Sequence, residues 1–155
     1  MNDILIKSAS DNTYKGGYDE YHVMMGAGFI DALHNGMTLK EPIENESALE
    51  NGSRIIVNKK KAKRTFNLTF NIHGSSKSEF LANKAKFEAM LYEGVVHMKI
   101  NDPQYVEYYH LIYTGKSVTY KHSYKVTFGI FTAQFIEPDP TDRGVNQTRQ
   151  VRVVG

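Results

Sequence analysis

Hydrophobic and polar residues alternate along the second half of the chain. From Arg64 to His73, apolar side chains occupy every second position, and Asn or Thr occupies most positions between them. A period of two places the apolar residues on one face of an extended strand. The same alternation recurs over residues 96–100, over residues 109–113 and from Tyr124 to Ile136, so the pattern predicts four strands in this half.

One helix is predicted between the first two of these strands. Gly74 interrupts the alternation, and Ser76 to Glu79 form a capping box, in which a serine hydroxyl and a glutamate carboxylate bind backbone amides at a helix start. From about Lys77 to Glu93 the large apolar residues recur at helical spacing. Gly94 is suited to ending this helix in a left-handed conformation.

The last predicted strand carries large apolar groups on both faces. Val126, Phe128 and Ile130 fall on one face, whereas Phe131 and Phe135 fall on the other. A strand with this pattern is typically covered on both sides. We expect the covering groups to come from the helix, a second sheet or a neighbouring subunit.

The first 63 residues are less regular. Ser8 to Gly17 predicts a loop, Tyr18 to Met25 a strand, and Phe29 to Leu33 a short helical turn. Residues 40–63 are polar and broken, and they include Asn51-Gly52, a dipeptide typical of tight turns. This segment is predicted to be either a long hairpin or a loop that orders only against a partner.

These elements predict one α+β domain over residues 1–143, with mostly antiparallel, sandwich-like sheets and one capped helix packed on them. A chain of 155 residues is long enough to bury a single hydrophobic core. Residues 144–155 are polar and basic, and we expect them to form a flexible or arm-like tail.

The composition of the chain argues against several classes of function. The formal net charge of +2 is too small to indicate a dedicated nucleic-acid binder. The absence of cysteine excludes disulfides and thiolate sites and fits folding in a reducing cytoplasm. We expect neither a secretion signal nor a membrane-spanning segment, because no apolar run reaches the roughly 18 to 20 residues that a membrane helix needs.

A basic run between residues 59 and 64 is the most prominent charge feature. One interpretation is a nucleic-acid contact, joined by Arg149 and Arg152 of the tail. The other interpretation, which we favour, is a solvated segment or one that pairs with another subunit. Proteins that bind single-stranded nucleic acid place aromatic side chains among their basic residues, and this run contains none. The residues predicted to form a subunit interface or arm are Asn51, Gly52, Lys59, Lys60, Lys61, Lys63 and Arg64.

The sequence offers little chemistry for catalysis or metal binding. Its six histidines include no His-x3-His or His-Glu-x-x-His spacing, although His97 and His110 are expected to meet across adjacent strands. The acidic pairs Asp19/Glu20 and Asp139/Asp142 fall in loops and turns and need only be solvated. We therefore predict no catalytic residue, no metal and no cofactor. The rival enzyme hypothesis, a hydrolase or sugar-binding protein, requires a concave pocket with perturbed acids.

Four sequence elements follow one another in a characteristic order. They are the arginine-led strand 64–74, the helix 78–91 closing on Gly94, the segment 109–113, and the ending 135–140 with Arg143 just beyond. This ordered set resembles the tail proteins of long-tailed phages, especially the N-terminal ring-forming domain of distal tail proteins. Residues 28–33 and 43–47 are similar to short tail proteins of prophages, so the resemblance extends over about residues 18–143.

The resemblance implies a domain shared by tail-tube subunits and distal tail hubs. Such domains assemble as hexameric rings around the DNA channel and join the tail tube to the baseplate or tip. The implied partners are other copies of the chain and neighbouring tail proteins, with DNA only as passing cargo and no membrane. The implied location is the virion, after synthesis in the bacterial cytoplasm. Hub, tail-tube subunit and tail-completion protein all stay open.

Overall fold

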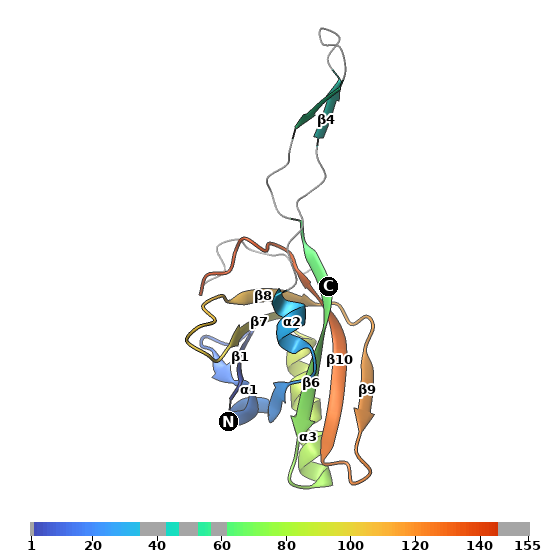
Figure 1. The fold of residues 1–155 in the computed structure, drawn as a ribbon. Coiled ribbons are helices and arrows are strands. Elements are labelled where there is room, and N and C mark those ends of the chain that lie inside the picture. The colour runs from blue at the N-terminus through green and yellow to red at the C-terminus, as the bar shows by residue number, and fades with distance from the viewer. Residues whose placement is uncertain (1, 35–42, 47–52, 57–61, 146–155) are drawn as a thin grey trace.

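The computed structural model describes residues 2–34, 43–46, 53–56 and 62–145 (Figure 1). Within these ranges eight strands form one antiparallel sheet in the order β2-β1-β7-β8-β10-β6-β3, with β9 also paired to β10. The elements of the main body are β1 (Ile4–Ser8), β2 (Lys15–Gly16), α1 (Gly17–Tyr21), β3 (Val23–Met25), α2 (Phe29–His34), β6 (Arg64–His73), α3 (Lys77–Leu91), β7 (Val95–Ile100), β8 (Tyr109–Tyr113), β9 (Thr119–His122) and β10 (Phe128–Glu137).

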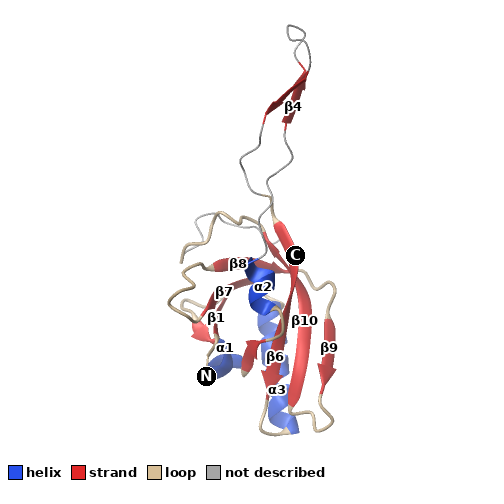
Figure 2. Cartoon of the chain, viewed as in Figure 1, coloured by secondary structure: helices blue, strands red, loops and turns tan. Residues whose placement is uncertain are grey.

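The sheet curls into a half-barrel, with α3 along its inner face (Figures 1 and 2). Two strands share one edge of β10: β8 pairs with its end at Phe135 and Ile136, and β9 pairs with its beginning from Gly129 to Thr132. Between β8 and β9 the chain bends, with Gly115 at a positive φ of 71°. The mostly antiparallel strands and few helices are compatible with the predicted α+β class, and the main body contains one curled sheet where sandwich-like sheets were predicted.

The centre of the sheet is the ten-residue ladder between β6 and β10. Burial alternates along both strands, and Phe70 and Phe131 are buried on the same face. Phe87 of α3 packs against this face, with its ring centroid 5.0 Å from that of Phe70 and 5.8 Å from that of Phe131. The strand predicted over Arg64–His73 is therefore confirmed, together with its buried face.

The predicted helix start is confirmed at α3. The Ser76 hydroxyl accepts a hydrogen bond from the Glu79 amide at 3.2 Å, which satisfies one of the free amides of the first turn. The Glu79 carboxylate accepts a hydrogen bond from the Ser75 hydroxyl. The helix itself ends at Leu91, and Gly94 has the predicted left-handed conformation, with a φ of 96°.

The strand predicted over Tyr18–Met25 is wrong in its first half, because α1 occupies Gly17–Tyr21. Gly17 and Tyr21 are buried four residues apart, a helical spacing. The Asn2 side chain also bonds the Asp19 amide at 2.9 Å, which holds the start of this short helix. β3 then begins after His22, which ends α1 in a left-handed conformation.

Three strands of the main sheet were not predicted, namely β1, β2 and β9, and β10 was predicted to begin too early; β2 lies within the segment Ser8–Gly17 that was predicted to be a loop. β1 was not predicted, although Ile4 and Ile6 are fully buried at alternating positions. β10 begins at Phe128, not at Tyr124, because residues 123–128 turn the chain back from β9: the Ser123 amide bonds the Phe128 carbonyl at 2.9 Å. Tyr124 is 99% exposed, so its aromatic ring packs nowhere in the domain.

None of the described helices combines the length and apolar character needed to cross a bilayer. The helices that pack on the β6–β10 ladder contact its inner face, as shown by Phe29 of α2 and Phe87 of α3 against Phe70.

Candidate functional site

Residues 43–46 and 53–56 form a hairpin that is separate from the main sheet (Figure 1). β4 (Ile43–Glu46) and β5 (Ser53–Ile56) pair antiparallel. The described part of the 40–63 segment is thus a hairpin, the first of the two predicted alternatives. The predicted arm residues Asn51, Gly52, Lys59, Lys60 and Lys61 lie outside the described residues.

The two ends of the hairpin segment meet in the body of the domain. α2 stops just before this segment and β6 starts just after it. The Arg64 Nη2 atom donates a hydrogen bond to the Leu33 carbonyl at 2.9 Å, across 31 positions of the chain. The Arg64 side chain is only 6% exposed, so this closing contact is made inside the protein.

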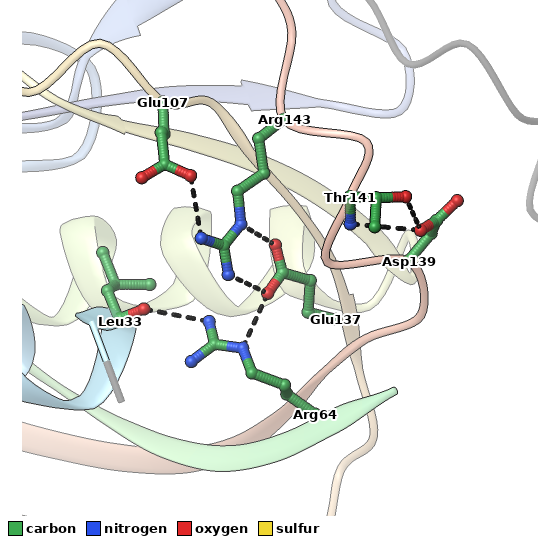
Figure 3. Close-up of polar contacts among 7 residues, drawn as sticks. All are labelled: Leu33, Arg64, Glu107, Glu137, Asp139, Thr141 and Arg143. Carbon is green, nitrogen blue, oxygen red and sulfur yellow. Dashed lines mark hydrogen bonds and ion pairs between the residues drawn. The ribbon is translucent and has the colours of Figure 1, made fainter. Parts of the chain in front are cut away.

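A buried carboxylate holds Arg64 in place. Glu137 lies opposite Arg64 in the β6–β10 register and is 1% exposed. Its Oε1 atom accepts hydrogen bonds from Arg64 Nε and from Arg143 Nη2, each at 2.8 Å, and its Oε2 atom accepts one from Arg143 Nε at 2.9 Å (Figure 3). One carboxylate therefore joins two guanidinium groups from distant parts of the chain.

Arg143 extends this network to the start of the C-terminal segment. Its Nη1 atom donates to Glu107 Oε2 at 2.8 Å, and its guanidinium carbon lies 4.8 Å from the centre of the Tyr109 ring. Its own carbonyl accepts from the Tyr108 amide at 3.0 Å. Burial by itself lowers the pKa of Arg143, but hydrogen bonds to Glu137 and Glu107 outweigh it and raise the pKa above its ordinary value.

We call Leu33, Arg64, Glu107, Glu137 and Arg143 the root cluster. The cost of removing its charges from water roughly offsets their attraction, so such a cluster adds little net stability. Removing one partner is different, because it leaves a buried charge unpaired at a cost of about 3–5 kcal/mol. The root cluster therefore acts mainly on geometry: it fixes the end of α2, the start of β6 and the chain at Arg143 relative to one another.

The environment of Arg64 differs from that of Lys63, the one described lysine with which it was grouped. Lys63 is exposed, but the Arg64 side chain is buried against Glu137 within the same subunit. Glu137 and Arg143 were not predicted as functional residues. A signal for Glu137 was present, since it continues the buried positions Phe131, Ala133 and Phe135 of β10, where an acid requires a partner.

The two histidines expected to meet across adjacent strands do so. His97 of β7 and His110 of β8 are paired in register, with their Nδ1 atoms 2.7 Å apart, and both are buried. His110 Nε2 donates to the Gly144 carbonyl at 2.8 Å, so a neutral His110 accepts the Nδ1 proton of His97. Burial first, then His110 and Lys7, lower the pKa of His97 to about 4.

Hollows on the described surface include two with acidic side chains in their lining. One, of about 310 Å³, is lined by Asp3, Asp31 and Met25 among others. Burial raises the pKa of Asp3, against the lowering effect of its hydrogen bond from the Met25 amide. The other, of about 240 Å³, lies beside the root cluster and includes Tyr105 and Glu107. In the described part of the chain, no three His, Asp or Glu side chains are grouped to hold a metal ion.

The predicted acidic pairs are not in these cavities. Asp19 is held by Asn2 at the start of α1, and Asp139 accepts hydrogen bonds from Thr141. In the root cluster, buried polar contacts converge from α2, β6, β10 and the segments around Glu107 and Arg143. No protein-family model matches this chain, and no curated protein matches its sequence.

Proposed function

We propose that this protein is a structural subunit of a phage or prophage tail. It assembles with copies of itself into a ring, which we propose to be a hexamer, and the ring joins the tail tube to the baseplate or tip. Its fold is then a variant of the sandwich-like tail-tube and distal-tail domain. It performs no covalent chemistry and works in the virion, with DNA passing through the ring.

The observation that carries this proposal is the β4–β5 hairpin with its root cluster. A two-stranded hairpin alone is marginally stable in water, and its two outer edges present unpaired amide and carbonyl groups. Arg64, Glu137 and Leu33 fix both ends of the segment that carries this hairpin. A hairpin on a fixed base is suited to pairing with a neighbouring subunit, which supplies main-chain hydrogen bonds for its edges.

A ring follows from this contact if it is heterologous. The hairpin of one copy then meets a different surface of the next copy, and the rotation between copies closes after a fixed number of subunits. An isologous hairpin contact would give dimers instead. The stoichiometry of the particles therefore reports which kind of contact the hairpin makes.

The test is negative-stain electron microscopy and light scattering of the full-length protein, alone and with neighbouring tail proteins. A matched variant replaces residues 43–46 and 53–56 by Gly and Ser in the full chain, keeping its length. We expect rings from the unchanged protein and folded, unassembled subunits from the variant. Normal rings from the variant would refute the hairpin contact, and absence of any assembly by the unchanged protein would refute the proposed function.

The same images separate the possible positions in the tail. A hub predicts single rings or paired rings, a tail-tube subunit predicts stacks of rings, and a completion protein predicts rings that form only on a tube end. The nucleic-acid alternative loses part of its basis, because the Arg64 side chain is buried and ion-paired. A DNA affinity that falls steeply as the salt concentration rises, measured on the monomer, would favour this alternative.

A further inference from the structure

The β6–β10 ladder has a second face, opposite α3, that we call the outer face. It consists of alternate residues, from Thr65 to His73 on β6 and from Phe128 to Ile136 on β10. The helices of the described chain pack on the inner face of this ladder. Thr65, Asn67 and Ile130 are exposed. Ile130 is a large hydrophobic residue, and 40% of its surface is in contact with solvent.

The outer face carries no Asp, Glu, Lys or Arg on either strand. Its ten positions hold threonines, side-chain amides, three apolar residues and His73. Charged residues make up 23% of the chain, whereas these ten positions hold none, and the flanking strand β9 adds one exposed cation, Lys121, in register with Ile130. Depletion of charged residues is one part of the compositional signal of the centre of a protein interface.

The chemistry of the outer face fits a second copy of itself. Hydroxyl and amide groups each contain a donor and an acceptor, so each can pair with its own kind. Thr69 and Thr132 already do this within the face, with their hydroxyl oxygens 2.9 Å apart. Across β6 and β10 two such faces meet without like-charge repulsion, with Lys121 of β9 at the margin beside Ile130, and the apolar side chains, including Phe128 and Ile136, are covered on both copies.

The size of the outer face sets the strength of the contact. The ten-residue strands β6 and β10 span roughly 33 Å by about 10 Å, and the short flanking strands β3 and β9 widen this surface to on the order of 400 Å² per copy. Two copies would bury on the order of 800 Å², which lies in the range of weak, transient contacts. The contact is therefore expected to be weak and to depend on concentration.

We infer that two copies of this protein associate face to face through the outer face of β6 and β10. This contact is isologous, so it is distinct from the heterologous hairpin contact of a ring and does not depend on it. It also meets the expectation that β10 is covered on both sides, by α3 on one and by a second molecule on the other.

The test compares two lysine substitutions of similarly exposed apolar residues. Ile130→Lys lies on the outer face, and Leu81→Lys lies on α3, where Leu81 is 46% exposed. Circular dichroism and thermal unfolding establish that both full-length variants are folded. The dimer dissociation constant is then measured by sedimentation velocity over a range of concentrations. We expect Ile130→Lys to weaken the dimer at least tenfold and Leu81→Lys to leave it within about twofold.

A mixing experiment tests the face-to-face geometry. Ile130→Lys and Ile130→Glu are each expected to stay monomeric, and an equal mixture is expected to recover dimers, because the opposite charges then face each other. A monomeric unchanged protein, equal effects of Ile130→Lys and Leu81→Lys, or no recovery on mixing would each overturn the inference. Loss of rings in the hairpin variant with the dimer retained would separate this contact from the proposed function.

Discussion

Acidification should destabilise this domain through one buried histidine. His97 lies 2.7 Å from His110, Nδ1 to Nδ1, and faces Lys7 on the neighbouring strand β1. Burial, His110 and Lys7 all disfavour a second proton on His97, so its pKa falls from an ordinary 6.5 to about 4. In the unfolded chain that proton binds freely at the ordinary pKa.

The sign and size of the stability change follow from the difference between the pKa values of His97 in the folded and unfolded states. Above pH 6.5 the histidine is neutral in both states, and its contribution to stability is fully present. As the pH falls towards 4 the unfolded chain takes up a proton that the folded protein refuses, so stability is lost across this window. Each pKa unit corresponds to about 1.4 kcal/mol, which gives a loss of roughly 3 kcal/mol by pH 4.

Urea unfolding at several pH values between 7.5 and 4 measures this loss. Carboxylates also titrate in this range, so the informative quantity is the difference between the unchanged protein and His97→Gln. Glutamine keeps a polar group at this position but binds no proton. His122→Gln, at an exposed position of β9, is the matched control and should behave like the unchanged protein.

We expect His97→Gln to be less stable at pH 7.5 but to lose roughly 3 kcal/mol less than the unchanged protein on acidification. If both proteins lose the same free energy between pH 7 and pH 4, then the buried histidine pair is not the origin of acid sensitivity. In that case protonation of carboxylates would account for the whole effect.

Three substitutions and one control test other parts of the fold by urea unfolding at pH 7. Glu137→Gln leaves two buried guanidinium groups without their carboxylate and should cost about 3 kcal/mol or more, whereas Glu107→Gln, on the half-exposed rim, should cost less than about 1 kcal/mol. Gly74→Ala would place a methyl group 2.5 Å from the Phe80 amide nitrogen, so we expect the free energy of unfolding to fall by about 2 kcal/mol. An unchanged free energy of unfolding would contradict the close packing of the turn between β6 and α3. Ser76→Ala removes the hydroxyl that caps α3 and should cost about 1 kcal/mol; an unchanged midpoint would mean that the cap is satisfied by solvent.

The elements that sequence predicted well are those whose burial repeats along the chain. β6 and α3 have large apolar residues at strict strand or helix spacing, and each has a local stop signal at Gly74 or Gly94. α1 lacked such a signal, because its few residues are rich in Tyr and flanked by His22, and its start depends on a contact with Asn2. Local preference and distant packing disagreed there, and packing prevailed.

The root cluster could be predicted only in part from the sequence. Arg64 and Glu137 stand at the ends of two core faces that otherwise contain apolar residues, which marks both as buried charges in need of partners. Their pairing depends on the β6–β10 register, and periodicity does not reveal register. Arg143 comes from a loop beyond β10, so only the three-dimensional path of the chain brings it to Glu137.

Because Arg64 is hydrogen-bonded to the Leu33 carbonyl, the stability of the domain depends little on the length and sequence of the segment between these two residues. Because the closure is made by the body, lengthening the intervening segment costs little, about 0.6 kcal/mol for each doubling. Segments of different length and sequence could thus be exchanged at this point while the half-barrel folds as before. Such modularity would let one scaffold acquire new assembly partners by changing only what is inserted between α2 and β6.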